Sequence, residues 1–580
     1  MKINKNLIIM IFFSLWIIFL MSTEVIYSEI SFLPLSEIKP GMQGIGKTVF
    51  KGTKIEEFQV EIIDIIRGEG DIPYYILAYL SEERVLDSGG ISEGMSGSPV
   101  YVQDKLIGAI SYSWEMSEHN YFLLTPIEEM LKLFDYDSLV KESIISSPSS
   151  TIAYSGETVL NNPSLFLPVS NVLVSGLSSR SFQLLSHRLN NYNLRAIQGV
   201  ESLGGINLST IGELPQQKIE AGSAIGIQLS RGDVNITAIG TVTYREGNKI
   251  IALGHPFLRK GEVSFLLSSV YIYHSLPNIV MPFKLGTPLN LIGKVSQDRA
   301  VGILGEINSF PQVIPLKIMV NNQDNSSSLS MGVQLVNDYD LLESLVSSIT
   351  LQAIDNGLDR IGPGTAQVRV ELKGKTEEQS LVRENMFCDT QDIALKSISE
   401  LPEIIRGLLE NYFEEVIISE INLNIQITKE KRLGRLEEVK LEKDTLKPGD
   451  NLKASVRIKP FREDLLEEQL TIRLPKDIPS GEAWLCVNGG GDIANFSEIN
   501  ILGEDKEKVS KNLSEVLEEI RDRPKGNQII AEIVYSLEQD YNQKEGVGIQ
   551  SSKKNNKKIQ VKIDTDLVIE GYLEIPFYVK

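Results

Sequence analysis

Short apolar runs separated by glycine, and not long amphipathic stretches, dominate the chain from about residue 30 to residue 320. Residues 29–142 carry such runs around Val49, Phe58–Ile63 and Leu106–Tyr112, and residues 171–320 carry a second set. Short runs of β-branched and aromatic residues bounded by turn residues are typical of strands. Both segments therefore predict a mainly β structure.

The rest of the chain changes character several times. A Ser/Pro-rich stretch predicts a linker over residues 143–170, and mixed helical and strand patterns predict an α/β region over 321–417. Alternating strands around the turn Lys447-Pro448-Gly449-Asp450 predict a β-sandwich-like domain over 418–500. Residues 501–580 predict a charged helical segment that ends in an apolar strand. The fold class is thus mainly β with some α, in several domains of about 100–200 residues each.

The first residues follow the pattern of an export signal. Two lysines precede an apolar run from Leu7 to Met21, which is the order of a secretory signal peptide. Ser28 is small enough to precede a cleavage site, but Ile26 is larger than the residue preferred two places earlier. Residues 1–28 are therefore expected to be either a cleaved signal peptide or an N-terminal membrane anchor. Either outcome places the chain in the cell envelope or outside the cell.

Charge and ligand-forming residues limit the classes of partner. The chain has 77 acidic and 57 basic residues, and its net charge of −20 argues against nucleic acid or an anionic membrane surface. Its four histidines and two cysteines do not have the spacing of a metal site, so no metal and no other cofactor is expected. Cys388 and Cys486 either form a disulfide or stay separate as two buried thiols.

The segment Gly94-Met95-Ser96-Gly97-Ser98-Pro99 has the composition of a nucleophile loop. Its glycines permit a tight turn that points the Ser96 hydroxyl outward. The N–H groups of Gly94 and Ser96 can then converge as an oxyanion hole. A serine becomes nucleophilic when a base removes its proton, and Ser96 is the candidate. The alternative is a glycine-rich hairpin that has no chemical role.

His255 is the candidate base. It follows an apolar strand in the segment IIALGHPF, where Gly254 and Pro256 hold it at a rigid edge. The alternative is a buried, hydrogen-bonded histidine with a structural role. The other three histidines have no comparable frame; they are His119, His187 and His274.

Three assignments are open for the acid that would orient His255. Asp298 lies 43 residues after His255, close to the spacing of about 45 in the chymotrypsin template. Asp87 lies nine residues before Ser96, and a dyad without an acid is the third solution. A substrate pocket is expected where the strand that starts at Leu106 ends, bordered by Ser111, Tyr112, Ser113 and Trp114.

Several of these segments resemble the SpoIVB-type serine peptidases. The matching text is PGMQGIGKTVFKGTKIEEFQVEI, DSGGISEGMSGSPVYVQDKLIGAI and TPIEEM in residues 35–135, and IIALGHPF in residues 222–310. The resemblance implies an exported serine endopeptidase with a protein or peptide substrate. It also implies a trypsin-like double β-barrel built from residues 29–142 and 171–320, with Ser96 as nucleophile and His255 as general base.

The chain departs from that family in three ways. In the family the histidine segment precedes the serine segment, so the two halves stand here in swapped order. The aspartate that precedes the serine block in the family aligns near Ser81, so that acid is not carried over. There is also no PDZ-like segment ahead of the peptidase part. The alternative function is a non-catalytic envelope binding or scaffolding protein that retains a peptidase-like fold, and a third option is autoprocessing alone.

Overall fold

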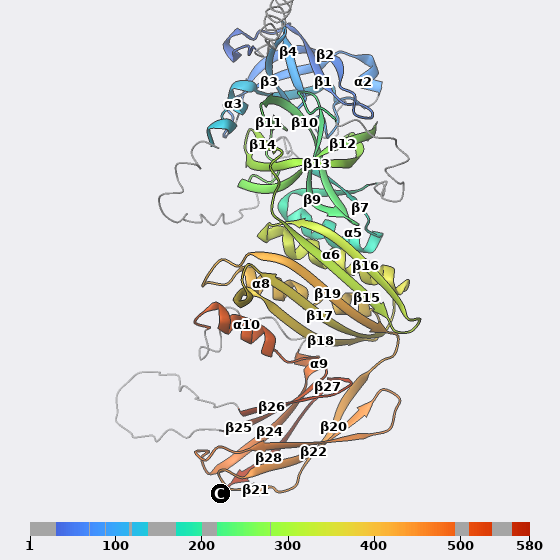
Figure 1. The fold of residues 1–580 in the computed structure, drawn as a ribbon, viewed down its shortest axis with the longest axis vertical. Helices are drawn as coiled ribbons and strands as arrows, with labels where there is room; N and C mark the ends of the chain where they lie inside the picture. The colour runs from blue at the N-terminus through green and yellow to red at the C-terminus, as the bar shows by residue number, and fades with distance from the viewer. Residues whose placement is uncertain are drawn as a thin grey trace, which may run out of the picture.

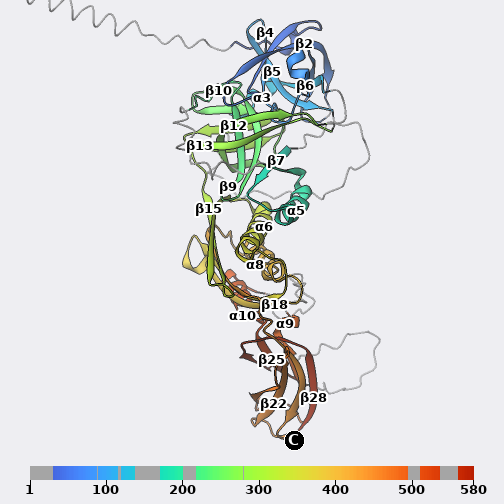
Figure 2. The ribbon, with the colours of Figure 1, turned by 90° about the vertical axis from the view of Figure 1, so that its right-hand side faces the viewer.

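A computed structural model describes residues 31–68, 70–87, 89–114, 119–136, 170–199, 217–278, 280–493, 510–535 and 559–580. The signal or anchor expected over residues 1–28 lies outside these residues, as does the linker expected over 143–170 except for its last residue. Within the described ranges, no helix has the length and apolar character needed to cross a membrane. The domains follow one another along the long axis of the molecule, from the N-terminal strands to the C-terminal sandwich (Figures 1 and 2).

The serine-bearing half is a closed six-stranded barrel with the order β1-β2-β3-β6-β5-β4. Alternation in β2 sends every second side chain inward, and Phe58, Val60 and Ile62 are buried. A 3-10 turn (Leu35–Glu37) and two short helices, α2 (Glu83–Asp87) and α3 (Ile127–Leu131), complete this half. Its strands are β1 (Gln43–Thr48), β2 (Glu56–Arg67), β3 (Tyr74–Leu80), β4 (Pro99–Val102), β5 (Lys105–Ser113) and β6 (Tyr121–Pro126).

The histidine-bearing half is a second barrel. Its strands are hydrogen-bonded in the order β9-β12-β13-β14-β11-β10, and pairing of β9 with β10 closes the ring. Numbered from one to six along the chain, the strands of both rings run 1-2-3-6-5-4. The predicted double β-barrel is confirmed, and its two halves share one topology. The strands are β9 (Ala224–Gly232), β10 (Asn235–Glu246), β11 (Lys249–Ala252), β12 (Gly261–Leu276), β13 (Phe283–Arg299) and β14 (Gly302–Ile307).

The second barrel is part of a larger sheet. On one side, β7 (Ser170–Ser175) pairs with β10 and leads through α5 (Ser179–Leu189) and a 3-10 turn (Asn190–Tyr192) to β8 (Leu194–Gln198). On the other side, β16 (Ser327–Val336) pairs with β9. The sheet then continues through β15 (Val313–Asn322), β19 (Ile418–Thr428), β17 (Gly364–Gly374) and β18 (Leu381–Asp389), thirteen strands in all.

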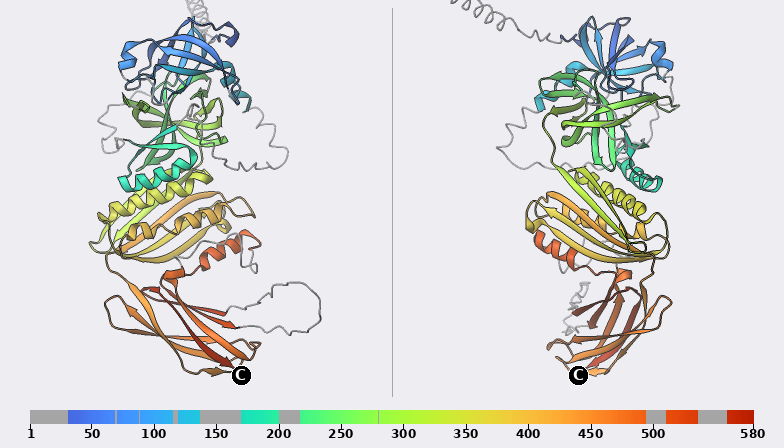
Figure 3. Two further views of the ribbon diagram at one scale, coloured as in Figure 1. Left: turned by 180° about the vertical axis from the view of Figure 1, so that it is seen from behind. Right: turned by 45° about the vertical axis from the view of Figure 1, so that its right-hand side comes forward.

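Helices cover one face of this extension, as Figure 3 shows for α6 (Tyr339–Leu358) and α8 (Leu401–Leu409). The short helix α7 (Ile393–Ser397) and a 3-10 turn (Glu377–Gln379) complete the α/β region. Helix α6 is buried along most of its length, because it lies between the sheet and its neighbouring helices. Although β19 falls inside the segment expected to form the sandwich, it pairs in parallel with β15 and belongs to this sheet.

The C-terminal domain is a β-sandwich of two sheets, β23-β22-β20-β27 and β21-β28-β24-β25-β26. It extends past residue 500 to the end of the chain, while α10 (Leu513–Asp522) packs on the α/β region. Cys388 on β18 and Cys486 on β24 are separate free thiols. The elements are β20 (Leu433–Leu441), β21 (Thr445–Leu446), β22 (Asn451–Pro460), β23 (Leu466–Arg473), β24 (Gly481–Gly489), α9 (Gly490–Ile493), β25 (Gln528–Tyr535), β26 (Ile559–Asp564), β27 (Val568–Glu570) and β28 (Tyr572–Val579).

An apolar cluster joins the two barrels beside the serine and histidine segments. Leu106, Ala109 and Met130 from the first barrel pack with Ile251 and Leu304 from the second, and all five side chains are buried. Burial of apolar surface at about 25 cal/mol per Å² favours this association over separate barrels. The two halves therefore pack as one unit, which fixes the relative positions of the loops at their junction.

Candidate active site

Ser96 and His255 lie at corresponding places in the two barrels. Ser96 is in the connection between the third and fourth strands of its ring, β3 and β4, and His255 is in the same connection of the other ring, between β11 and β12. Two small cavities of about 40 Å³ each lie at the junction, and both are lined by Ser96, His255 and Glu93. The structure thus brings the two predicted residues to one place.

Glycine allows the serine loop to press against the second barrel. Gly97 has a φ of +92°, and a Cβ atom there would lie 2.0 Å from the carbonyl oxygen of Thr241 on β10. Thr241 N–H donates to Ser96 O at 2.8 Å, and the Thr243 hydroxyl donates to Gly97 O at 2.8 Å. Only glycine permits both this conformation and this close approach.

The two N–H groups expected to form the oxyanion hole have unusual surroundings. Among the described residues, neither Gly94 N–H nor Ser96 N–H donates a hydrogen bond. The N–H groups around them all donate: residue 93 to Pro282 O, 95 to Ser92 O, 97 to Ile110 O and 98 to Met95 O. Two donors are therefore left available in a loop whose other donors are satisfied, which is the arrangement that a developing oxyanion requires.

Neighbouring carbonyl groups set the directions of these two donors. Glu93 O accepts from Lys284 N–H at 2.9 Å, and Met95 O accepts from Ser98 N–H at 2.8 Å. In a planar trans peptide, the C=O of one residue and the N–H of the next point in opposite directions. Gly94 N–H therefore points away from β13, and Ser96 N–H points away from Ser98.

Two successive left-handed residues hold the histidine in place. Leu253 has a φ of +72° and Gly254 a φ of +74°. The hydroxyl of Thr125, on β6 of the serine-bearing barrel, donates to Gly254 O at 2.6 Å. A left-handed leucine stores strain, so the surrounding contacts must maintain this turn.

The environment of the His255 ring selects its protonation state. His255 is 6% exposed, and its ring Nδ1 lies 2.8 Å from the carbonyl oxygen of Pro256. Because that carbonyl can only accept, Nδ1 carries the proton and Nε2 keeps its lone pair. Burial lowers the pKa of His255 to about 4. The imidazole is therefore neutral at pH 7 and is in the tautomer that a base at Nε2 needs.

Asp298, the first candidate for the acid, contacts the histidine segment through its backbone. Its carboxylate is fully buried and accepts from Phe257 N–H at 2.8 Å and from Leu258 N–H at 2.7 Å. Burial raises the pKa of Asp298, and these backbone hydrogen bonds oppose that rise. These contacts differ from those of the predicted triad acid, because the hydrogen bond of His255 Nδ1 goes to Pro256 O. The second candidate, Asp87, ends α2, and its side chain lies outside the described residues.

Three of the four expected pocket residues border the site. Ser111, Tyr112 and Ser113 line one of the two cavities, and Trp114 is not among the residues that do. Strand β4 pairs with β5 only as far as Ala109, whereas β5 continues to Ser113. In the described part of the chain, the last residues of β5 therefore have β6 as their one neighbouring strand.

Sequence reasoning missed Lys284, which also lines the site. Its side chain is 2% exposed, and its Nζ lies 2.7 Å from the Thr48 hydroxyl. Burial lowers the pKa of Lys284 to about 7. A lysine within the apolar stretch that opens β13, Phe283-Lys284-Leu285, was the available signal.

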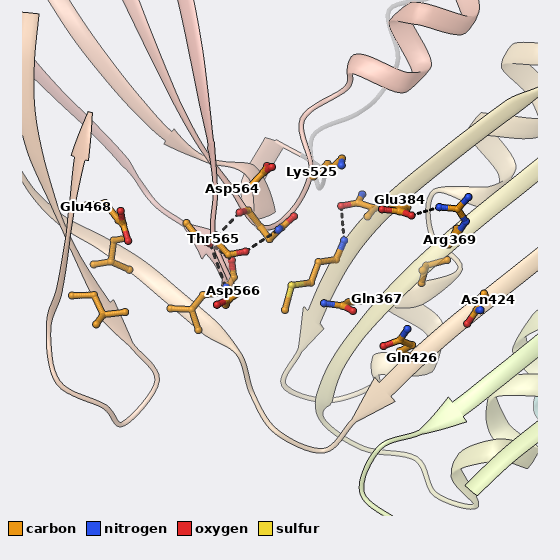
Figure 4. Close-up of a pocket in the computed structure, with 17 residues that line it drawn as sticks. Gln367, Arg369, Glu384, Asn424, Gln426, Glu468, Lys525, Asp564, Thr565 and Asp566 are labelled. Carbon is orange, nitrogen blue, oxygen red and sulfur yellow. Dashed lines mark hydrogen bonds and ion pairs between the residues drawn. The ribbon is translucent and has the colours of Figure 1, made fainter. Parts of the chain in front are cut away.

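A larger cavity of about 720 Å³ lies elsewhere, between strands β17–β19 and the sandwich (Figure 4). Several of its polar groups are paired with one another: Arg369 with Glu384, as Figure 4 shows, and the Asn527 amide, which donates to Thr565 O. Its one hydroxyl, on Thr565, donates to Leu567 O. Among the described residues that line it, this cavity therefore holds no counterpart of the serine and histidine pair.

Comparison with known protein families gives a match that includes most of the first barrel. Residues 2–131 match the family described as SpoIVB peptidase S55. The match includes Ser96 and ends before the histidine segment. No curated protein and no solved structure gives a significant match. The resemblance of the serine-bearing half to SpoIVB-type peptidases is thereby confirmed, and a peptidase of that family is the activity that the match supports.

Proposed function

We propose that this chain, whose first barrel matches the SpoIVB peptidase S55 family, is a serine endopeptidase that cleaves a protein or peptide substrate outside the cytoplasm. The observation that carries the proposal is the meeting of Ser96 and His255 from corresponding loops, beside two N–H groups that have no acceptor among the described residues. Export rests on the signal pattern in residues 1–28.

The reaction is acyl transfer. Ser96 Oγ attacks the carbonyl carbon of the scissile peptide, and His255 Nε2 takes the hydroxyl proton. The carbonyl oxygen becomes an oxyanion that accepts from Gly94 N–H and Ser96 N–H. As the C–N bond breaks, Nε2 returns the proton to the leaving amine. Water then attacks the acyl-enzyme, with Nε2 again as base, and releases the carboxylic acid and free Ser96.

The histidine acts in this proposal without a carboxylate on its ring. Pro256 O accepts from Nδ1–H and so fixes the tautomer and the ring plane, while Asp298 is a positioning residue that holds the turn after Pro256. A carbonyl dipole stabilises an imidazolium less than a carboxylate charge does, because it carries no net charge. The base is accordingly weak, and it remains neutral well into the acid range.

The end of β5 supports an extended substrate. An edge without a second partner strand offers backbone groups to an incoming peptide, which then adds to the sheet as a strand. Residues 111–113 lie beside Ser96 and His255 in this position. An endopeptidase needs such a surface because it must hold the chain on both sides of the cleaved bond.

A fluorophosphonate probe tests the proposal directly, since it reacts only with an activated serine. We expect the full-length protein to be labelled, Ser96→Ala to be unlabelled, and His255→Ala to be labelled far more slowly. Ser98→Ala is the matched control, because that hydroxyl is buried in the same loop and has no partner among the described residues. A folded wild-type protein that resists labelling contradicts the proposal.

A binding or scaffolding role is the second candidate, favoured by the cavity of about 720 Å³ that lies apart from the serine loop. This role would survive Ser96→Ala and would be lost when the sandwich is deleted. Those two variants, compared in one functional assay, distinguish the candidates.

A further inference from the structure

We propose that Lys284 is a positioning residue of this active site, which holds the oxyanion hole in its working geometry and places a positive charge behind it. The inference rests on the proposed peptidase function. It adds to the active site the side chain of a residue on β13, outside both the serine loop and the histidine segment.

The backbone around Lys284 clamps one peptide of the oxyanion hole. Lys284 N–H donates to Glu93 O at 2.9 Å, and Glu93 N–H donates to Pro282 O at 2.8 Å. These two bonds form an isolated parallel bridge between the serine loop and the start of β13. The direction of Gly94 N–H is therefore set by a strand of the other barrel.

The side chain of Lys284 reaches the other side of the same glycine. A Cβ atom on Gly94 would lie 3.1 Å from Cβ and from Cδ of Lys284, so the lysine chain runs alongside Gly94. Its Nζ then contacts the Thr48 hydroxyl at 2.7 Å, and the Thr48 and Thr241 hydroxyl oxygens are 3.5 Å apart. Thr241 donates from its hydroxyl to Gly94 O at 2.9 Å.

Gly94 is thus held from both of its peptides. The backbone of Lys284 fixes the peptide before it, and the chain of hydroxyls that starts at Lys284 Nζ ends on the carbonyl after it. Thr241 also donates from its N–H to Ser96 O at 2.8 Å, so the same network reaches the nucleophile. The participants come from β13, β1 and β10, which are distant in sequence and meet only at the junction of the barrels.

Among the described residues Lys284 forms no ion pair, and its Nζ has the Thr48 hydroxyl as its hydrogen-bond partner. A buried ammonium is costly to maintain, and an apolar side chain of similar size would pack there without that cost. Glu93 and His255 are the other titratable groups that line this cavity. The hydroxyls of Thr48 on β1 and Thr241 on β10 continue from Lys284 Nζ, and Ser275 on β12 is paired with Lys284 across the two strands. The oxyanion of the transition state would supply the absent negative charge, and the ammonium would stabilise it selectively.

A distinctive pH dependence follows. The ammonium is lost as pH rises through about 7, because burial lowers the pKa of Lys284 to that value. His255 loses its proton and becomes a neutral base as pH rises through about 4, the value to which burial lowers its pKa. The labelling rate should therefore rise near pH 4 and fall near pH 7, which gives a bell-shaped profile on the acid side.

The experiment measures the rate of fluorophosphonate labelling of the full-length protein against pH. Lys284→Met keeps the length of the side chain and removes the charge. We expect its rate at the optimum to fall about tenfold or more, its fall near pH 7 to disappear, and its thermal stability to hold or rise. Thr48→Val should reproduce part of the loss, and Thr48→Ser, which keeps the hydroxyl, should restore it.

The outcomes separate the two proposals. If wild-type protein is not labelled, the peptidase function itself fails. If wild-type protein is labelled, and folded Lys284→Met keeps both its rate and its pH profile, the role of Lys284 is overturned while the peptidase stands. Should Lys284→Met fail to fold, Thr48→Val with a wild-type rate overturns the role in its place.

Discussion

The hydroxyl of Thr125, on the serine-bearing barrel, donates a hydrogen bond of 2.6 Å to the carbonyl oxygen of Gly254, the residue before His255. Both residues are buried, so the bond forms out of contact with water. The backbone that carries the histidine is thus tied to the barrel that carries the serine.

Removal of that tie should weaken both catalysis and folding. In Thr125→Val the shape of the side chain is kept, but Gly254 O loses its donor, at a cost of about 1–3 kcal/mol. We expect the labelling rate of Ser96 to fall several-fold and the free energy of unfolding to fall by that amount. Thr125→Ser keeps the hydroxyl and should behave as wild type; equal losses in both variants would contradict this explanation.

Stability should depend on pH through His255. Its pKa is about 4 in the folded chain and about 6.5 when exposed, so the unfolded state binds more protons between these values. The contribution is fully present above pH 6.5 and is lost as pH falls through 4, and it amounts to about 3 kcal/mol. Lowering the pH from 7 to 4 should therefore destabilise wild type more than His255→Gln, as measured by thermal unfolding of both proteins. If the stability of the two proteins fell equally with pH, the burial of neutral His255 would not be the cause.

Gly97 should tolerate no side chain. In Gly97→Ala the new Cβ would lie 2.0 Å from Thr241 O, and the alanine would have to adopt a φ of +92°. The serine loop must therefore withdraw from β10. We expect labelling to be lost and the free energy of unfolding to fall by several kcal/mol. Gly247→Ala is the control, since its φ of +57° is also left-handed but no atom lies within 4 Å of the new Cβ. Chemical denaturation of both variants gives the comparison.

Asp298→Asn tests whether the buried carboxylate acts on the ring or on the turn. A triad acid lowers kcat by about 10⁴ when it becomes an amide, because the histidine tautomer is lost. A positioning residue that holds Phe257 and Leu258 should lower it about 10- to 100-fold and should reduce stability, since one buried acceptor becomes a donor. We expect the smaller loss. A kcat reduced by about 10⁴ in a protein of unchanged stability would return Asp298 to the role of acid.

The local patterns in the sequence were sufficient to predict the strands and the serine loop. Alternation in β2 and the glycines around Ser96 are fixed by sterics within a few residues, and the structure agrees with both. Closure of the second barrel depends on the pairing of β9 with β10, and the family resemblance, not periodicity, led to it. The parallel pairing of β19 with β15 joins residues about a hundred positions apart, and the sequence carried no sign of it.

The site shows the same division. Ser96 and His255 were identifiable because glycine and proline next to a reactive side chain leave a pattern in one segment. Lys284 and Thr125 act through partners on other strands, so their roles depend on the packing of the barrels. The proximity of Asp298 to the histidine segment was foreseen from spacing, but its hydrogen bonds to backbone groups were not.

Strand β9 belongs to two structures at once, since it closes the histidine barrel through β10 and β12 and also pairs with β16 of the downstream sheet. Mechanical load on the α/β region therefore passes along one continuous hydrogen-bonded sheet into the half that carries His255. Among the described residues, the half that carries Ser96 contacts this sheet at the junction between the barrels. Tension on the α/β region would therefore act first on the relative position of the two barrels, and so on the distance between Ser96 and His255.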